Sequence, residues 1–255
     1  MTLSYEQRIR GTRRRRLGLT LTELVVAVGV LVLLVLGFGV VLSQSQKVVV
    51  GAQEVIRANT TAAAIQDVIR EDIRQASQFG VLHIEPDKLV VLRAGVSHSL
   101  TSPVTGMGSV VKYARTSSDV LYRQGWILSG DGTGGSPSGD VQNYDLADIQ
   151  GMSPAEAQNF AQTIASAADP SLTEEPASLT DMNALWQFLA GDCTDLSFEW
   201  ATGNGGSLMW SSGTQTWTRD DEWPTAVKMQ FTVVGTSLPE EIASQPYEVI
   251  CPLAQ

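Results

Sequence analysis

An uncharged apolar stretch near the N-terminus constrains this chain more than any other feature. From Leu24 to Leu42 the 19 residues include no charged side chain, and as an α-helix they would span about 28 Å. That length matches the roughly 30 Å hydrocarbon core of a bilayer. A basic block, Arg13–Arg16, lies upstream of the stretch. We therefore expect one membrane-spanning helix with its N-terminus in the cytoplasm and the rest of the chain outside.

Charge is distributed unevenly along the 255 residues. The formal net charge is -10, yet the first 18 residues contain six arginines and a single acid. Without that segment, 11 basic residues face 26 acidic ones, which leaves a net charge of -15. A body this acidic repels phosphate backbones, so we expect no nucleic-acid partner.

Three simpler interpretations of the apolar stretch compete: a cleaved secretory signal, an uncleaved signal anchor and a buried core helix. The stretch exceeds the roughly 7–15 apolar residues of a secretory signal, although Ser43-Gln44-Ser45 resembles its cleavage site. The arginine block argues against a core helix. None of the three explains Glu23, a carboxylate placed one residue before the span, where a charge is costly unless it has a partner.

The residues around Glu23 resemble the class III signal of type IV pilins and type II secretion pseudopilins. A basic leader ends in Gly18, Leu19 follows it, and Glu23 is the fifth residue after the glycine. The resemblance implies that prepilin peptidase cleaves between Gly18 and Leu19 and N-methylates Leu19. Two departures from the family pattern are Leu19 itself, where phenylalanine is commoner, and Thr22, where an aliphatic residue is usual.

Such processing would leave the apolar helix on the mature protein with a cationic amine at Leu19. In an assembly of parallel helices, Glu23 of one subunit would meet the amine of a neighbour, and their attraction would offset the desolvation of both groups. The implied organisation is a leader over residues 1–18, a transmembrane and assembly helix over 19–45 and a periplasmic globular domain over 46–255. The implied location is the bacterial inner membrane, and after assembly a periplasmic or surface filament.

The rest of the sequence predicts an α+β fold. Apolar residues at spacings of three and four continue the helical pattern, so we expect one helix over residues 19–76. Two further helices are predicted at Pro154–Ala168 and Thr180–Leu189. Short β-type runs are predicted at Val81–Ile84, Leu89–Ala94, Ser109–Arg115, Val120–Gln124, Asp195–Ala201, Ser207–Trp210, Thr214–Thr218, Ala226–Val234 and Tyr247–Pro252. A long helix packed on antiparallel sheets, with a helical insertion, is the expected outcome, and pilin domains have that shape.

Three short segments are similar to the J component (GspJ) of type II secretion or to its pilus relative PilW. They are Ile69–Ala76, Val120–Arg123 and Trp223–Met229. Glu23 argues against the K component, which typically lacks that glutamate. The resemblance implies a minor subunit of a filament-tip complex. Its partners would be I- and K-type minor subunits, the major pseudopilin, prepilin peptidase and an inner-membrane assembly platform.

No pattern in the sequence predicts catalysis, a metal or a cofactor. The two histidines, His83 and His98, are not accompanied by a nucleophile-elbow motif. Asp131, Asp140 and Asp145 lie in and beside a glycine-rich loop over residues 129–140, but their spacing does not fit an EF-hand, and we interpret them as solvated. A membrane-anchored periplasmic binding or sensor domain that never polymerises remains the alternative function.

Two residue types bear on how the domain is stabilised. Cys193 and Cys251 are predicted to form a disulfide in an oxidising compartment, and two separate buried thiols are the alternative. The four tryptophans in and beside the predicted C-terminal strands are expected to pack in the core and on sheet faces rather than to form a binding platform. They are Trp200, Trp210, Trp217 and Trp223.

Overall fold

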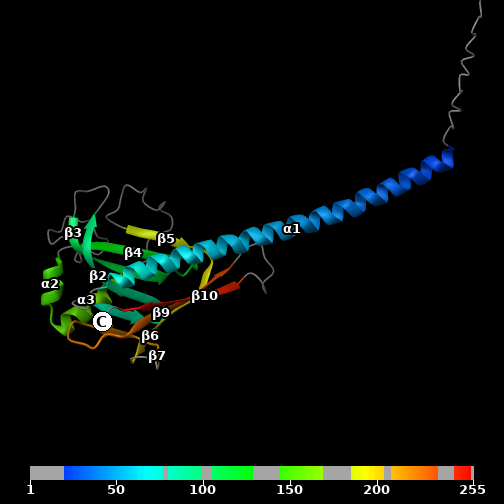
Figure 1. Ribbon diagram of the computed structural model, residues 1–255. Helices are drawn as coiled ribbons and strands as arrows, with labels where there is room; N and C mark the ends of the chain where they lie inside the picture. The colour runs from blue at the N-terminus through cyan, green and yellow to red at the C-terminus, as the bar shows by residue number, and fades with distance from the viewer. Residues whose placement is uncertain are drawn as a thin grey trace, which may run out of the picture. The chain divides into compact units, whose positions relative to one another are not determined.

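The structure is a computed structural model, drawn in Figure 1. It describes residues 20–76, 80–98, 105–128, 144–168, 185–203, 208–234 and 244–253, with the side chains of 96–98, 105–106, 185–188 and 244–245 excepted. The chain divides into two compact units, residues 1–50 and 51–255, and each is treated by itself. Gly18, Leu19 and the glycine-rich loop over 129–140 lie outside the described residues.

Helix α1 runs from Leu21 to Arg74, inside the predicted range. All of its residues from Leu21 to Val50 are exposed. In the second unit the same helix is amphipathic, because its apolar residues recur on one face. The fully buried members of that face are Ala62, Ile65, Ile69 and Ile73.

Within the described residues the second unit contains two antiparallel sheets. The first has the strand order β5-β4-β3-β2-β1-β8 and the second the order β10-β9-β6-β7. The first sheet consists of β1 (Leu82–Glu85), β2 (Lys88–His98), β3 (Thr105–Arg115), β4 (Leu121–Leu128), β5 (Leu185–Ala190) and β8 (Gln215–Trp217). The second consists of β6 (Cys193–Thr202), β7 (Met209–Ser211), β9 (Ala226–Val234) and β10 (Ser244–Pro252).

The first sheet is buried on both faces, because alternate residues of its strands belong to different hydrophobic clusters. Leu89 and Val91 of β2 pack with the buried face of α1 and with the inner face of the second sheet. Val90 and Leu92 pack on the other side, with α2 (Leu146–Gly151) and α3 (Pro154–Ala165). The sheet therefore lies between α1 on one side and the inserted helices on the other.

The predicted fold class is confirmed. A long N-terminal helix packs on antiparallel sheets, and helices are inserted between β4 and β5. Helix α3 begins where Ser153-Pro154 predicted it, and a reciprocal capping box between Ser153 and Glu156 closes its first turn.

One prediction in this part of the chain was wrong, and one helix was missed. The helix predicted at Thr180–Leu189 is instead strand β5 where the structure describes it, paired antiparallel with β4 from Gly125–Leu185 to Leu121–Ala190. Its residues are adequate helix formers, but pairing with a distant strand satisfies the backbone and overrides local preference. Helix α2 was not predicted, since its six residues are too few to show a period.

Candidate functional site

Glu23, the predicted assembly residue, lies in the first turn of α1 and is held by Thr20. The backbone N–H and the hydroxyl of Thr20 each donate to Glu23 Oε2, both at 2.9 Å. In return, the backbone N–H of Glu23 donates to the hydroxyl of Thr20 at 3.3 Å. These contacts form a capping box that satisfies backbone groups at the helix start. Sequence reasoning missed this local role, although Thr-x-x-Glu is the recognised signal for it.

The apolar segment that follows Glu23 presents its side chains outward. Leu33 is 69% exposed and Phe38 66% exposed, and no residue between Leu21 and Val50 is buried. By length and composition, α1 is the one described helix that is long and apolar enough to cross a membrane. This segment and Glu23 are the part of the predicted assembly site that the structure describes.

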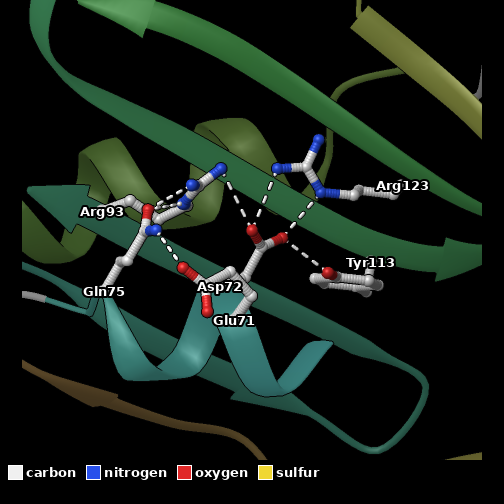
Figure 2. Close-up of polar contacts among 6 residues, drawn as sticks. All are labelled: Glu71, Asp72, Gln75, Arg93, Tyr113 and Arg123. Carbon is white, nitrogen blue, oxygen red and sulfur yellow. Dashed lines mark hydrogen bonds and ion pairs between the residues drawn. The ribbon is translucent and has the colours of Figure 1, made fainter. Parts of the chain in front are cut away.

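A second group of polar residues is buried where the last turn of α1 meets the first sheet. Figure 2 shows Asp72 facing Arg93 from β2, Tyr113 from β3 and Arg123 from β4. We call these four residues the Asp72 cluster. Asp72 is only 3% exposed, so its carboxylate has been removed from water and depends on these partners.

Each oxygen of the Asp72 carboxylate has two polar contacts in the cluster, and of these contacts three are hydrogen bonds and one is an ion pair. Arg123 binds both oxygens, with Nε 2.6 Å from Oδ2 and Nη2 3.1 Å from Oδ1. Arg93 Nη1 lies 3.0 Å from Oδ1, and the Tyr113 hydroxyl donates to Oδ2 at 2.5 Å. The two-pronged contact with a guanidinium is the strongest geometry available to a carboxylate.

The electrostatics of the Asp72 cluster favour a charged pair beside a neutral phenol. Burial and the neighbouring Asp72 charge raise the pKa of Tyr113 well above its usual value. Burial opposes the charge of Arg123, but the hydrogen bonds and charge of Asp72 outweigh it and raise the pKa of Arg123. Arg93 extends the cluster toward the surface, where it also hydrogen-bonds the side-chain oxygen of Gln75.

The local sequence explains why these side chains converge. Asp72 follows Ile65 by seven residues and Ile69 by three, so helical spacing puts it on the buried face of α1. Tyr113 and Arg123 are direct cross-strand partners, and so they share one face of the sheet. The spacing of Asp72 was a detectable signal. Its partners, 41 and 51 residues away, were not predictable from spacing.

A hydrogen-bonded row of Thr216, His83 and Glu85 lies near the sheet edge. His83 Nδ1 is 2.7 Å from the Thr216 hydroxyl, and His83 Nε2 is 3.2 Å from the Glu85 carboxylate. His83 and Thr216 are register partners of β1 and β8, and Glu85 is two residues further along β1. Antiparallel pairing alone places these three side chains together, and the row joins the edge strand β8 to the sheet.

The predicted disulfide is wrong, because Cys193 and Cys251 are separate free thiols, both buried. Cys193 is opposite Val233 of β9, whereas Cys251 is opposite Val227 on the other side of the same strand. Six residues of a strand span about 20 Å. A disulfide needs its Cα atoms within roughly 4.4–6.8 Å, so this fold cannot form the bond.

The tryptophans lie mainly in the core, as expected. Trp217 and Trp223 are buried, and Trp200 packs edge-to-face on Trp217 with ring centroids 5.3 Å apart. Trp210 is half-buried, and the ammonium of Lys228 lies 4.7 Å from its ring centroid. Asp145, the described member of the three acidic loop residues, is the N-cap of α2.

Comparison with known proteins assigns the chain to no family. No family model matches the sequence, and no curated protein matches it significantly. Among solved structures, a chain of the GspK-GspI-GspJ complex from the enterotoxigenic Escherichia coli type 2 secretion system aligns with a TM-score of 0.41 at 11% identity. The alignment covers 78% of this chain and 99% of that one.

Proposed function

We propose that this chain is a structural subunit of a pilin-like filament, anchored by α1 in the inner membrane before assembly. Within that class it is a minor pseudopilin or minor pilin of the J or PilW type, acting at the filament tip with I- and K-type subunits. The observation that carries the proposal is the apolar segment of α1, outward-facing over its whole length and headed by a single carboxylate. Such a surface requires lipid or other apolar helices around it.

Processing is the first step of the proposed function. Prepilin peptidase cleaves between Gly18 and Leu19, removes the arginine-rich leader and methylates Leu19. The test is co-expression of the full chain with a prepilin peptidase, followed by intact-mass measurement of the purified protein. Loss of residues 1–18 and one added methyl group are expected. An intact N-terminus after co-expression with an active peptidase contradicts the proposal.

Assembly is the second step, in which Glu23 pairs with the Leu19 amine of a neighbouring subunit. The capping box supplies a matched pair of variants, because a glutamine at this position can still accept hydrogen bonds from Thr20 but carries no charge. Glu23→Gln and Glu23→Ala should both be processed normally and both be excluded from filaments. Incorporation of Glu23→Gln, with exclusion of Glu23→Ala, would show that Glu23 acts through the helix cap alone.

One observation favours a second candidate, a tethered binding or sensor domain that never polymerises. The Glu23 carboxylate has hydrogen-bond donors within its own chain, so it does not need a second subunit. Under this alternative the leader stays attached and α1 acts only as a signal anchor. The same mass measurement separates the two functions.

A further inference from the structure

The Asp72 cluster is a polar group within a mainly apolar contact between the described part of α1 and the first sheet. Around it, Ile65, Ile69 and Ile73 pack against strand residues such as Val91 and Val111. Apolar contacts hold a helix onto a sheet, but they are non-directional, so they resist sliding along the helix axis only weakly. Hydrogen bonds and ion pairs depend steeply on distance and angle, and they fix position.

We propose that the Asp72 cluster is an axial lock, which sets the register of α1 on the sheet and prevents it from sliding. The inference goes beyond the proposed function, since it holds whether or not the chain polymerises. Its consequence is that an axial load on α1 is transferred to three adjacent strands through one carboxylate. Arg93, Tyr113 and Arg123 come from β2, β3 and β4, which are neighbours in the sheet (Figure 2).

A slip of α1 by one turn shows why the Asp72 cluster favours a single register. One helical turn is about 5.4 Å and brings the residue four positions later to the same place. Movement toward the N-terminus would put Ala76 where Asp72 was, leaving two guanidiniums without a counter-charge. Asp72 itself would move to the present place of Val68, which packs against the apolar core. An unpaired buried charge is far more costly than an exchanged apolar contact.

The backbone at the end of α1 is consistent with a fixed register. The Ala94 N–H of β2 donates to the Gln75 carbonyl oxygen at 3.0 Å, and Ala76 forms a bridge with Arg93. Gln75 also accepts from the Arg93 side chain, and its amide donates to Glu71 at 2.5 Å. A sliding helix would break these contacts together with the Asp72 cluster.

The test measures register directly, by electron–electron distance measurement between two spin labels. Arg74→Cys on α1 and Ile250→Cys on β10 are both exposed sites, and Cys193→Ala with Cys251→Ala removes the native thiols. Gln66 of α1 contacts Glu248 of β10, and Arg74 lies eight residues further on, about 12 Å along the helix. The label on α1 moves with the helix while the label on β10 stays with the sheet, so an axial slip changes their separation.

The lock predicts that Asp72→Asn introduces a second distance, displaced by up to about 5 Å, the rise of one helical turn. Ile69→Ala is the matched control, because it removes buried volume from the same turn without touching the Asp72 cluster. It should keep a single distance. The full chain in detergent is used throughout. If Asp72→Asn does not fold, the triple variant Asp72→Ala, Arg93→Gln and Arg123→Gln is measured instead, because it removes the charges of the Asp72 cluster together and leaves none of them unpaired. A folded variant that keeps the single wild-type distance overturns the proposal.

Discussion

The two halves of α1 differ in what surrounds them, although they form one continuous helix. From Leu21 to Val50 all side chains are exposed and nearly all are uncharged. From Gly51 to Arg74 an apolar face is buried and charged residues occupy the remaining surface. The first half is suited to an apolar solvent on all sides, and the second to a sheet on one side and water on the other.

One carboxylate from each half shows how a buried and an exposed carboxylate are satisfied differently. Glu23 is exposed and accepts hydrogen bonds from Thr20, three residues earlier in the chain. Asp72 is buried, and its polar partners come from three strands that are distant in the sequence. A carboxylate at a helix start can be satisfied locally, whereas one on a packed face needs the tertiary fold. Substitutions in the second half should therefore lower the free energy of unfolding. Substitutions in the first half should instead alter membrane insertion and assembly.

The largest expected effect is at Asp72. Asp72→Asn leaves two guanidiniums facing a neutral amide, and breaking a buried ion pair in this way costs about 3–5 kcal/mol. Denaturant unfolding of the full chain in detergent measures the loss. Asp67→Asn is the control, because Asp67 lies on the exposed side of the same helix and its pair with Arg70 is 3.6 Å long. Equal losses for the two variants would mean that the Asp72 cluster contributes no more than a surface pair.

The second-largest effect is expected from a substitution in the first half of α1. Leu33→Arg places a charge near the middle of the apolar stretch, which costs about 2.5–3.5 kcal/mol of membrane insertion. We expect a larger soluble or degraded fraction on membrane fractionation, with unchanged unfolding of the second unit. Arg57→Leu, outside the apolar stretch, is the control and should not alter the membrane-bound fraction. Full membrane retention of Leu33→Arg would show that the segment does not meet lipid hydrocarbon.

The features that the sequence could predict are those whose interacting residues lie close together in the chain. Local signals sufficed for α1, for the start of α3 and for β9, which was predicted at its observed bounds of Ala226–Val234. The strand β5 was mistaken for a helix because its pairing partner is 60 or more residues away. The same limit applies to the Asp72 cluster. Two of the segments quoted for the family resemblance, Ile69–Ala76 and Val120–Arg123, meet there, and no spacing rule predicts that contact.

A smaller loss of stability is expected when an isoleucine is shortened, and it should differ between the two faces of the second half of α1. Ile69→Val removes one methylene from a fully buried site and should cost about 0.5–1.5 kcal/mol. Ile56→Val makes the same chemical change at a side chain that is 65% exposed, and it should cost less. Denaturant midpoints under identical detergent conditions give the difference. A loss at Ile56 equal to that at Ile69 would indicate that the outer face of the helix is also packed.

The last prediction concerns how fast the cysteine thiols react with a reagent, and it involves no change in stability. Burial raises the pKa of Cys193 and of Cys251 to about 11, so at about pH 8 only about one thiol in a thousand is the reactive thiolate. The native chain should resist a thiol reagent, and both cysteines should react once the chain is unfolded. Val49→Cys, at an exposed position of the first half, should add one thiol that reacts at once in the native protein. Reductant should leave the unfolding midpoint unchanged, since no disulfide is present to break. Native labelling of Cys193 or Cys251 at the rate of the Val49→Cys thiol would show that the sheet interior opens readily, and the packed surroundings of the second half of α1 would then protect little more than the exposed first half.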